Sequence, residues 1–219
     1  MSSHKELEPI ASFCESQGLP WGEECAERMA RYLDLLMQFN ESMNLIGPLD
    51  RETVVRELLL DSVVAAGARS PRGPILDVGT GAGLPGIPLK ILCPDCPISL
   101  VEPRRKRSTF LKIATHRLGL EEVSIERCRI ENFDGDGYDF AISKAFEAPT
   151  SWLATAAPRI LSTGVVLCMA RRADEQALVE EAADLGLELV GSATSSNSRV
   201  RSGEQRVCYA FGKADSEQK

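Results

Sequence analysis

The chain has 219 residues, which suits one α/β domain with an extension and is short for two full-sized domains. Hydrophobic residues make up 43% and charged residues 26% of the chain, close to globular averages, so wholesale disorder is excluded. The 25 Lys and Arg residues are outnumbered by 32 Asp and Glu residues, giving a net charge of −7. This balance argues against a protein that grips nucleic acid over its whole surface, because neutralisation of phosphates dominates such binding.

The chain shows no sign of a membrane or secretory protein. No apolar run reaches the roughly 18 residues that a membrane span needs, since glycines and prolines interrupt the densest stretch, residues 75–92. The first residues, MSSHKELEPI, lack the apolar core of a secretory signal, so we expect a cytoplasmic location. The seven cysteines are scattered, as expected of reduced thiols. Cys93 and Cys96 have CxxC spacing, but no second Cys or His pair lies nearby, so we expect no metal site.

The first 70 residues predict helices. Apolar residues recur at intervals of three and four between Cys25 and Phe39, which is typical of a helix that packs one face inward. A second helix is expected after Asp50, a suitable N-cap residue, with apolar positions from Val54 to Val63. The proline and glycine cluster at 70–74 then marks a boundary. We therefore predict a helical extension over residues 1–72.

After this boundary short apolar segments alternate with helical ones. The predicted strands are residues 75–78, 98–101, 123–126, 140–143 and 165–169. The predicted helices run from a glycine-rich turn at 79–86 to about residue 92, and over residues 106–118, 149–161 and 174–185. Such alternation is typical of a parallel, doubly wound sheet. Two more strands, 187–193 and 206–211, are joined by a polar loop without a helix, so we expect them to be antiparallel.

These elements predict a Rossmann-like α/β fold. The sheet would have seven strands, mostly parallel, with an antiparallel last strand. We place this domain at residues 73–212, after the helical extension, and expect the polar residues 213–219 to form a tail.

The most specific feature lies between the first predicted strand and the next helix. Gly81, Gly83 and Gly86 match GxGxxG in the strand–turn–helix context that the motif requires. Backbone N–H groups at the start of a helix favour anionic or acceptor groups. Glu102 ends the second predicted strand, where a carboxylate can accept both hydroxyls of a ribose. The pattern predicts a nucleoside cofactor without identifying it.

Three functions are compatible with this loop: a dinucleotide-binding oxidoreductase, a transferase that uses S-adenosyl-L-methionine, and a module that only binds. Asp77 precedes Gly79 by two residues and could engage a cationic sulfonium or amino group, whereas it would repel a pyrophosphate. The residues after the loop are too few for a separate catalytic domain. The terminal strand pair without a helix also suits a methyltransferase sheet. We therefore favour the transferase.

Motifs in a fixed order over residues 30–212 point to one family of such enzymes. They are Asn44-Leu45, Leu60-Asp61-Ser62, DVGTGAGLPGIPL at 77–89, Glu102 followed by Lys106-Arg107 and Phe110-Leu111, Arg129-Ile130-Glu131, and DFAISKAF at 139–146. With these motifs the chain resembles the bacterial 16S ribosomal RNA guanine-N7 methyltransferases, also called the glucose-inhibited division protein B family. The resemblance implies S-adenosyl-L-methionine as cofactor and 16S rRNA, free or in the small ribosomal subunit, as partner. We expect a monomer.

The resemblance also implies roles for individual residues. Gly79 and Leu84 line the methionine end of the cofactor, and Glu102 binds its ribose. Ile130 and Glu131 flank its adenine. Together with the loop, the predicted cofactor-binding residues are Asp77, Gly79, Gly81, Gly83, Leu84, Glu102, Ile130, Glu131 and Lys144.

Lys144 and Arg171 are the predicted catalytic residues. Lys144 stands where the family has an arginine beside cofactor and substrate, and either cation could hydrogen-bond the guanine and position it. Guanine N7 presents a neutral lone pair in the major groove, so its methylation needs no general base. This agrees with a chain that has only two histidines.

RNA contact on an acidic protein must come from local basic patches. The predicted RNA-binding residues are Arg104, Arg105, Lys106, Arg107, Arg199 and Arg201. The chain departs from the family pattern at Glu57-Leu58, which replaces Arg-His, at Ala170-Arg171, which replaces Lys-Gly, and at 203–206, where Gly-Glu-Gln-Arg displaces an arginine by one position. Because these positions are expected to face RNA, a methyltransferase of the same fold with another substrate stays an alternative.

Overall fold

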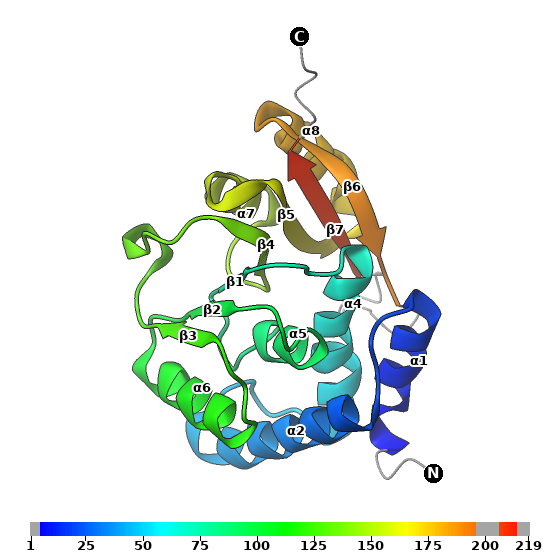
Figure 1. Cartoon of the computed structure of the whole chain (residues 1–219), viewed down its shortest axis with the longest axis vertical. Helices are drawn as coiled ribbons and strands as arrows, with labels where there is room; N and C mark the ends of the chain where they lie inside the picture. Colours follow the sequence, from blue (N-terminus) through cyan, green and yellow to red (C-terminus); the bar gives the residue numbers. More distant parts are fainter. Residues whose placement is uncertain (1–4, 196–205, 214–219) are drawn as a thin grey trace.

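The computed structural model describes residues 5–195 and 206–213 and contains a seven-stranded sheet with helices on both faces (Figure 1). The strands are β1 (Ile75–Val78), β2 (Ile98–Val101), β3 (Val123–Glu126), β4 (Tyr138–Ser143), β5 (Ile160–Arg171), β6 (Leu187–Ala193) and β7 (Arg206–Lys213). Their order in the sheet is β3-β2-β1-β4-β5-β7-β6. The first five strands pair in parallel, whereas β7 is antiparallel to both β5 and β6. The predicted fold class is confirmed.

Helical segments precede the sheet and connect most of its strands. They are η1 (Lys5–Leu7), α1 (Glu8–Gln17), α2 (Glu23–Met43), α3 (Arg51–Thr53), η2 (Val54–Leu59), α4 (Leu60–Ala68), α5 (Gly86–Leu92), α6 (Arg105–Arg117), η3 (Ile130–Asn132), α7 (Pro149–Ala156), η4 (Ala157–Arg159), η5 (Arg172–Asp174) and α8 (Glu175–Asp184). Asp50 caps this part of the chain as predicted, since its Oδ1 accepts a hydrogen bond from the Thr53 N–H at 2.8 Å.

Several predicted boundaries are wrong, most of all those around β5. The helix expected over 149–161 ends before Ile160, and β5 starts there instead of at residue 165. Ile160 pairs with Tyr138 across a register shift, so the irregular pairing lengthens both β4 and β5 at their amino ends. The helix expected after Asp50 also contains a wider π-helical segment, η2, in which the Leu60 N–H bonds the Val55 carbonyl. Periodicity of apolar residues did not predict this segment.

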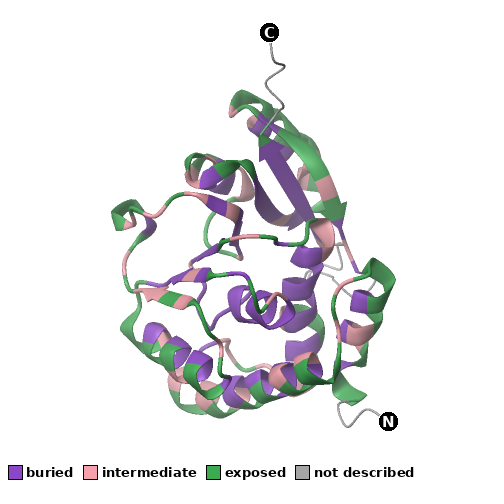
Figure 2. Cartoon of the chain, in the orientation of Figure 1, coloured by how far each residue is buried: buried purple, intermediate pink, exposed green. Residues whose placement is uncertain are grey.

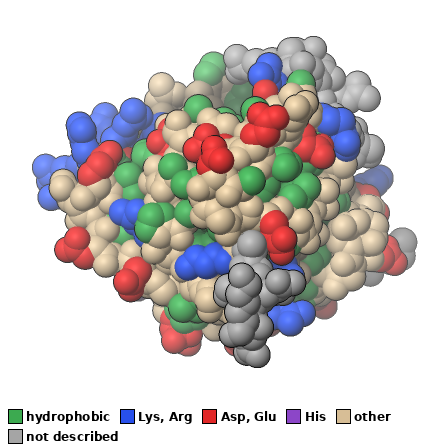
Figure 3. Space-filling view, turned by 90° about the horizontal axis from the view of Figure 1, so that it is seen from above, with side chains coloured by type: hydrophobic (Ala, Val, Ile, Leu, Met, Phe, Trp, Pro, Cys, Tyr) green, Lys and Arg blue, Asp and Glu red, His purple; other side chains and the backbone are tan. Residues whose placement is uncertain are grey.

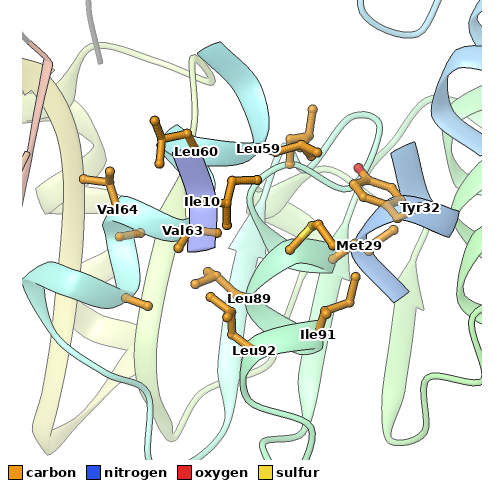
Figure 4. Packing of buried hydrophobic residues seen from close by; sticks show 14 of the residues in the cluster. Ile10, Met29, Tyr32, Leu59, Leu60, Val63, Val64, Leu89, Ile91 and Leu92 are labelled. Atoms are coloured by element: carbon orange, nitrogen blue, oxygen red, sulfur yellow. The ribbon is translucent and has the colours of Figure 1, made fainter. Parts of the chain in front are cut away.

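The N-terminal helices pack on the same face of the sheet as α5. Figure 4 shows Ile10 beside Val63 of α4 and Met29 beside Ile91 of α5, and these residues belong to one continuous apolar cluster with β1 and α6. The hydroxyl of Tyr32 donates to the Ala82 carbonyl at 2.8 Å, so α2 directly supports the glycine loop. The domain boundary at residue 72 stays a prediction, but the extension clearly braces the sheet.

Helices α7 and α8 cover the opposite face and enclose a second apolar cluster. Burial is greatest in the inner strands of the sheet and in α4 and α5, as the purple elements of Figure 2 show, whereas the edge strands β3 and β6 are mostly not buried. Trp152 is buried, and its indole N–H donates to the Leu167 carbonyl at 2.9 Å, which makes it a core residue. No helix within the described part of the chain is long and apolar enough to span a bilayer.

Candidate functional site

The glycine loop leaves β1 at the carboxyl edge of the parallel strands. Gly79, Gly81 and Gly83 have φ values of +67°, +60° and +93°, a left-handed backbone region that strongly favours glycine. The Gly79 N–H donates to the Val101 carbonyl at 2.9 Å, which ties the loop to the end of β2. The sequence therefore forms a tight strand-to-helix turn whose backbone can approach a ligand.

Glu102 joins this loop to the segment after β2. Its carboxylate is buried and accepts hydrogen bonds from the Gly81 N–H at 3.0 Å and the Arg104 N–H at 2.8 Å. The Arg107 guanidinium lies 3.8 Å from the same carboxylate. Because an ionised carboxylate offers about four acceptor positions, Glu102 retains acceptors for a ligand.

Asp77, in β1, holds the glycine loop that follows it through two hydrogen bonds. It is fully buried, and its Oδ2 accepts hydrogen bonds from the Thr80 hydroxyl and, at 2.8 Å, from the Gly86 N–H. Its Oδ1 is buried without a hydrogen-bond partner in the described structure. Burial raises the pKa of this carboxyl to about 7, although the two hydrogen bonds act in the opposite direction. Asp77 thus shapes the loop and keeps one unused acceptor.

A cavity of about 390 Å³ opens beside this loop. Its volume lies within the range of small-molecule sites. It is lined by Val78, Gly79, Val101, Pro103, Arg104, Cys128, Arg129, Ile130, Glu131 and Phe146. The structure therefore brings the predicted residues Gly79, Ile130 and Glu131 together, although they come from segments far apart in the chain.

The remaining predicted cofactor residues lie around this cavity rather than on its walls. Gly81, Gly83 and Leu84 form the loop itself, and Leu84 is buried at the turn into α5. A Cβ atom at Gly83 would lie 2.4 Å from the Ile87 side chain, so this glycine permits close packing of the loop on its own helix. Their contribution is the shape of the backbone beside the cavity.

Phe146 is a wall residue that the motif analysis did not assign to the cofactor. A Cβ atom at Gly79 would lie 2.7 Å from the Phe146 ring, so the ring rests against the loop. The side chain remains 40% exposed, which is unusual for a large apolar group. Its position two residues after Lys144, at the end of a buried strand, was the available signal.

Lys144 is directed toward the N-terminal helices and is absent from the walls of the 390 Å³ cavity. Its Nζ lies 3.4 Å from the carbonyl oxygens of Glu57 and Leu58 and 3.7 Å from Asp61 Oδ2. Burial lowers the pKa of Lys144 to about 8, while the Asp61 carboxylate acts in the opposite direction. The role of Lys144 beside cofactor and substrate stays a prediction.

The predicted RNA-facing cations occupy different environments. Arg104, Arg105 and Lys106 are exposed at the start of α6, whereas Arg107 leans toward Glu102. Arg171, at the end of β5, bonds Asp174 at 2.7 Å. Figure 3 shows Lys and Arg side chains gathered at one rim of a face that elsewhere mixes both charges. Arg199, Arg201 and the 203–205 part of the displaced motif lie outside the described residues.

No group of three or more His, Cys, Asp or Glu side chains in the described residues is placed to hold a metal ion. Cys93 and Cys96 are free thiols. The Lys90 ammonium instead donates to the carbonyls of Pro94 at 2.6 Å and Cys96 at 2.8 Å, which fixes this segment as a turn.

Comparison with known families decides between the interpretations of the glycine loop. The sequence model described as GidB, rRNA small subunit methyltransferase G, matches residues 25–201. The chain belongs to this family. The resemblance drawn from its motifs is therefore confirmed, and the chain is a member of a methyltransferase family rather than of an oxidoreductase family.

Curated relatives carry the name ribosomal RNA small subunit methyltransferase G. The protein of Leuconostoc citreum is 32% identical over 219 residues, covering 94% of this chain and 90% of the relative. That of Halorhodospira halophila is 33% identical over 190 residues, covering 86% and 88%. That of Chromohalobacter salexigens is 35% identical over 171 residues, covering 78% and 81%. The similarity to the Leuconostoc citreum protein thus extends along nearly the whole of both chains.

Solved structures share the fold at much lower identity. Ribosomal protein L11 methylase of Lactobacillus delbrueckii matches with a TM-score of 0.56 and 11% identity, covering 76% of this chain and 80% of that one. TYW2 of M. jannaschii, in complex with AdoMet, matches with a TM-score of 0.55 and 13% identity, covering 82% and 77%. These matches place the chain in the methyltransferase fold.

Proposed function

We propose that this protein transfers a methyl group from S-adenosyl-L-methionine to N7 of a guanine in 16S rRNA of the small ribosomal subunit. Membership of the rRNA small subunit methyltransferase G family supports the reaction and the RNA. The observation that carries the proposal is the cavity between Gly79 and Ile130, at the carboxyl edge of β1 and β2, beside the glycine loop that Glu102 binds through the Gly81 N–H.

The residues around this cavity fit the cofactor. Gly79 lets the Phe146 ring lie against the loop, because a Cβ atom at this position would collide with the ring. Glu102 retains acceptors for the hydroxyls of a ribose, and Ile130 and Glu131 form the wall proposed for the adenine. Asp77 holds the loop and leaves Oδ1 as an acceptor. When bound, the cofactor supplies an electrophilic methyl group on a cationic sulfur.

The protein itself mainly needs to orient the guanine. N7 has a lone pair that requires no prior loss of a proton, so no general base is needed. Holding two reactants in a productive geometry can supply much of the reduction in the barrier. Arg171, the last residue of β5, lies at the same edge of the sheet as the cavity and stays the proposed cation for positioning the base.

The start of α6 is the proposed RNA contact among the described residues. Arg104, Arg105 and Lys106 are exposed there, and Arg104 also lines the cavity. Phosphate groups of RNA are the natural partners of such a run, and their neutralisation makes binding fall steeply with rising salt. The patch would hold the RNA backbone beside the methyl-transfer site.

The test is incubation of the purified protein with labelled S-adenosyl-L-methionine and small-subunit RNA from a strain that lacks the enzyme. Digestion of the RNA to nucleosides should reveal labelled N7-methylguanosine. Naked 16S rRNA and intact small subunits are assayed in parallel, because the preferred form identifies the substrate. RNA transcribed with 7-deazaguanosine, which lacks the N7 lone pair, should take up no label. Label on another base, on protein or on a small metabolite would contradict the proposed substrate.

A further inference from the structure

A buried carboxylate connects the N-terminal helices with the strands of the sheet. Asp61, in α4, is only 2% exposed, and an ionised carboxylate in such a place needs nearby cations or hydrogen-bond donors. Arg206, at the start of β7, hydrogen-bonds Asp61 Oδ2, and the Lys144 ammonium lies 3.7 Å from the same oxygen. One side chain of α4 therefore contacts residues from two distant segments of the chain.

The π-helical segment η2 completes the binding site for the Lys144 ammonium. The carbonyls of Glu57 and Leu58 both lie 3.4 Å from Lys144 Nζ, and Leu58 also accepts a hydrogen bond from the Ser62 hydroxyl at 2.6 Å. These two carbonyls accept hydrogen bonds from the ammonium, and the Asp61 carboxylate adds an ion pair from the same side. Wider helical turns of this kind occur frequently at functional sites. The acceptors explain why Lys144 is directed to the extension.

Anchoring Lys144 in this way also fixes the turn that follows β4. Ala145 has a φ of +56°, a left-handed conformation that a residue other than glycine rarely adopts. The next residue, Phe146, reaches back across the glycine loop and lines the cofactor cavity. The path from Asp61 to the cavity thus consists of one ion pair and two consecutive residues.

We propose that Asp61 is a positioning residue for methyl transfer, whose carboxylate anchors Lys144 and thereby holds the Phe146 ring against Gly79 at the cavity. This inference rests on the proposed function, because it assigns a task within the same site. The N-terminal helices then do more than pack on the sheet, because α4 influences the shape of the cavity wall through the contact between Asp61 and Lys144. Asp61 acts through other residues and does not itself line the cavity.

A double-mutant cycle tests this coupling. We expect Asp61→Asn to lower kcat/KM for methyl transfer about tenfold, mainly through a higher KM for S-adenosyl-L-methionine. In a Phe146→Ala background, which has already lost the ring, the same substitution should cost less than about twofold. Asp34→Asn is the matched control, because Asp34 pairs with Arg51 at the exposed surface. A full tenfold loss in both backgrounds, or none in either, would overturn the proposal.

Loss of the fold is a separate outcome, since Asp61→Asn leaves two partly buried cations with a weaker partner. Circular dichroism identifies that case, and Lys144→Gln then replaces Asp61→Asn in the same cycle, because it removes a buried charge instead. The same two outcomes, coupling lost or retained in the Phe146→Ala background, support or overturn the proposal.

A direct reporter separates this inference from the proposed function. Tryptophan emission from Phe146→Trp, corrected for the emission of the protein without that substitution, should shift to longer wavelength when Asp61→Asn is added, because the ring leaves the loop. The shift is measured without cofactor or RNA. An unchanged spectrum would overturn the positioning role, whereas absence of methyl transfer in the wild-type protein would overturn only the proposed function.

Discussion

The glycine loop and the Asp61 cluster are assembled over very different separations along the chain. Gly81 bonds Glu102 across 21 residues, whereas Arg206 reaches Asp61 across 145 and Lys144 reaches Leu58 across 86. The first is a property of one strand–turn–helix unit and the strand beside it. The second exists only after the N-terminal helices have packed on the sheet. The glycine loop is therefore a local structure, whereas the contact between Asp61 and Lys144 depends on the whole fold.

The largest effect is expected from a substitution in the glycine loop itself. Gly79→Val adds a Cβ atom within 2.7 Å of the Phe146 ring at a φ of +67°. We expect affinity for S-adenosyl-L-methionine to fall about 100-fold or more, equivalent to about 2.7 kcal/mol, as measured by calorimetry. Gly119→Val is the control, because its φ is +61° but nothing lies within 4 Å of the added atom. Equal losses in both variants would show backbone strain rather than a blocked cavity.

Removing the charge of Glu102 tests the second part of the local site, the carboxylate that binds the glycine loop. In Glu102→Gln one carboxylate oxygen becomes an amide group that must face an N–H donor, either that of Gly81 or that of Arg104. We expect cofactor binding to weaken about 30-fold, or about 2 kcal/mol, the range for hydrogen bonds to charged groups. Glu126→Gln, at the end of the neighbouring strand β3, should bind like the wild type. Unchanged binding in Glu102→Gln would refute its role at the ribose.

Titration of Asp77 provides a test that needs no ligand. Its folded pKa, raised from 3.8 to about 7, means that the folded protein binds more protons than the unfolded chain between these values. The contribution of Asp77 to the free energy of unfolding therefore falls as pH rises from about 4 to about 7, by at most about 1.4 kcal/mol per pH unit. Denaturant unfolding should show this fall relative to Asp77→Asn, which retains an acceptor oxygen for Gly86. Parallel pH profiles of the two proteins would contradict it.

The smallest effects are expected at the start of α6. Reversing the exposed charges, in Arg105→Glu or Lys106→Glu, should weaken binding to 16S rRNA about fivefold each near physiological salt and flatten its salt dependence. Cofactor affinity should stay unchanged in both variants. Arg28→Glu is the control, because Arg28 lies near the opposite end of α6, beside Arg117. Equal RNA affinity in all these variants would exclude the patch from the RNA surface.

The features of this structure that could be predicted from the sequence are those that depend on local contacts, and the features that could not be predicted depend on distant ones. The strands β1, β2, β3 and β6 begin and end at their predicted residues, because short segments rich in apolar residues between turn residues carry a strong local signal. The glycine loop could also be predicted, since its conformation depends on residues within one turn. The extra length of β5 could not, because it arises from pairing of Ile160 with Tyr138 on another strand.

Site residues divide in the same way. Gly79, Ile130 and Glu131 lie on the cavity as the motifs indicated, whereas the wall position of Phe146 and the direction of Lys144 were not foreseen. Both depend on η2, whose carbonyls become acceptors for Lys144 only within the packed extension. No repeat or spacing in the sequence encodes a contact between Leu58 and Lys144. Asp61 and Lys144 belong to two of the motifs that indicated the family, and the structure shows that their charged groups lie 3.7 Å apart.

The most direct test of the central claim is a calorimetric titration of S-adenosyl-L-methionine into the wild-type protein, Gly119→Val and Gly79→Val. Binding of one molecule per chain to the first two proteins, with no measurable heat from Gly79→Val, is the predicted result. No binding to the wild type, or equal binding to all three, would contradict a methyl-donor site at the carboxyl edge of β1 and β2.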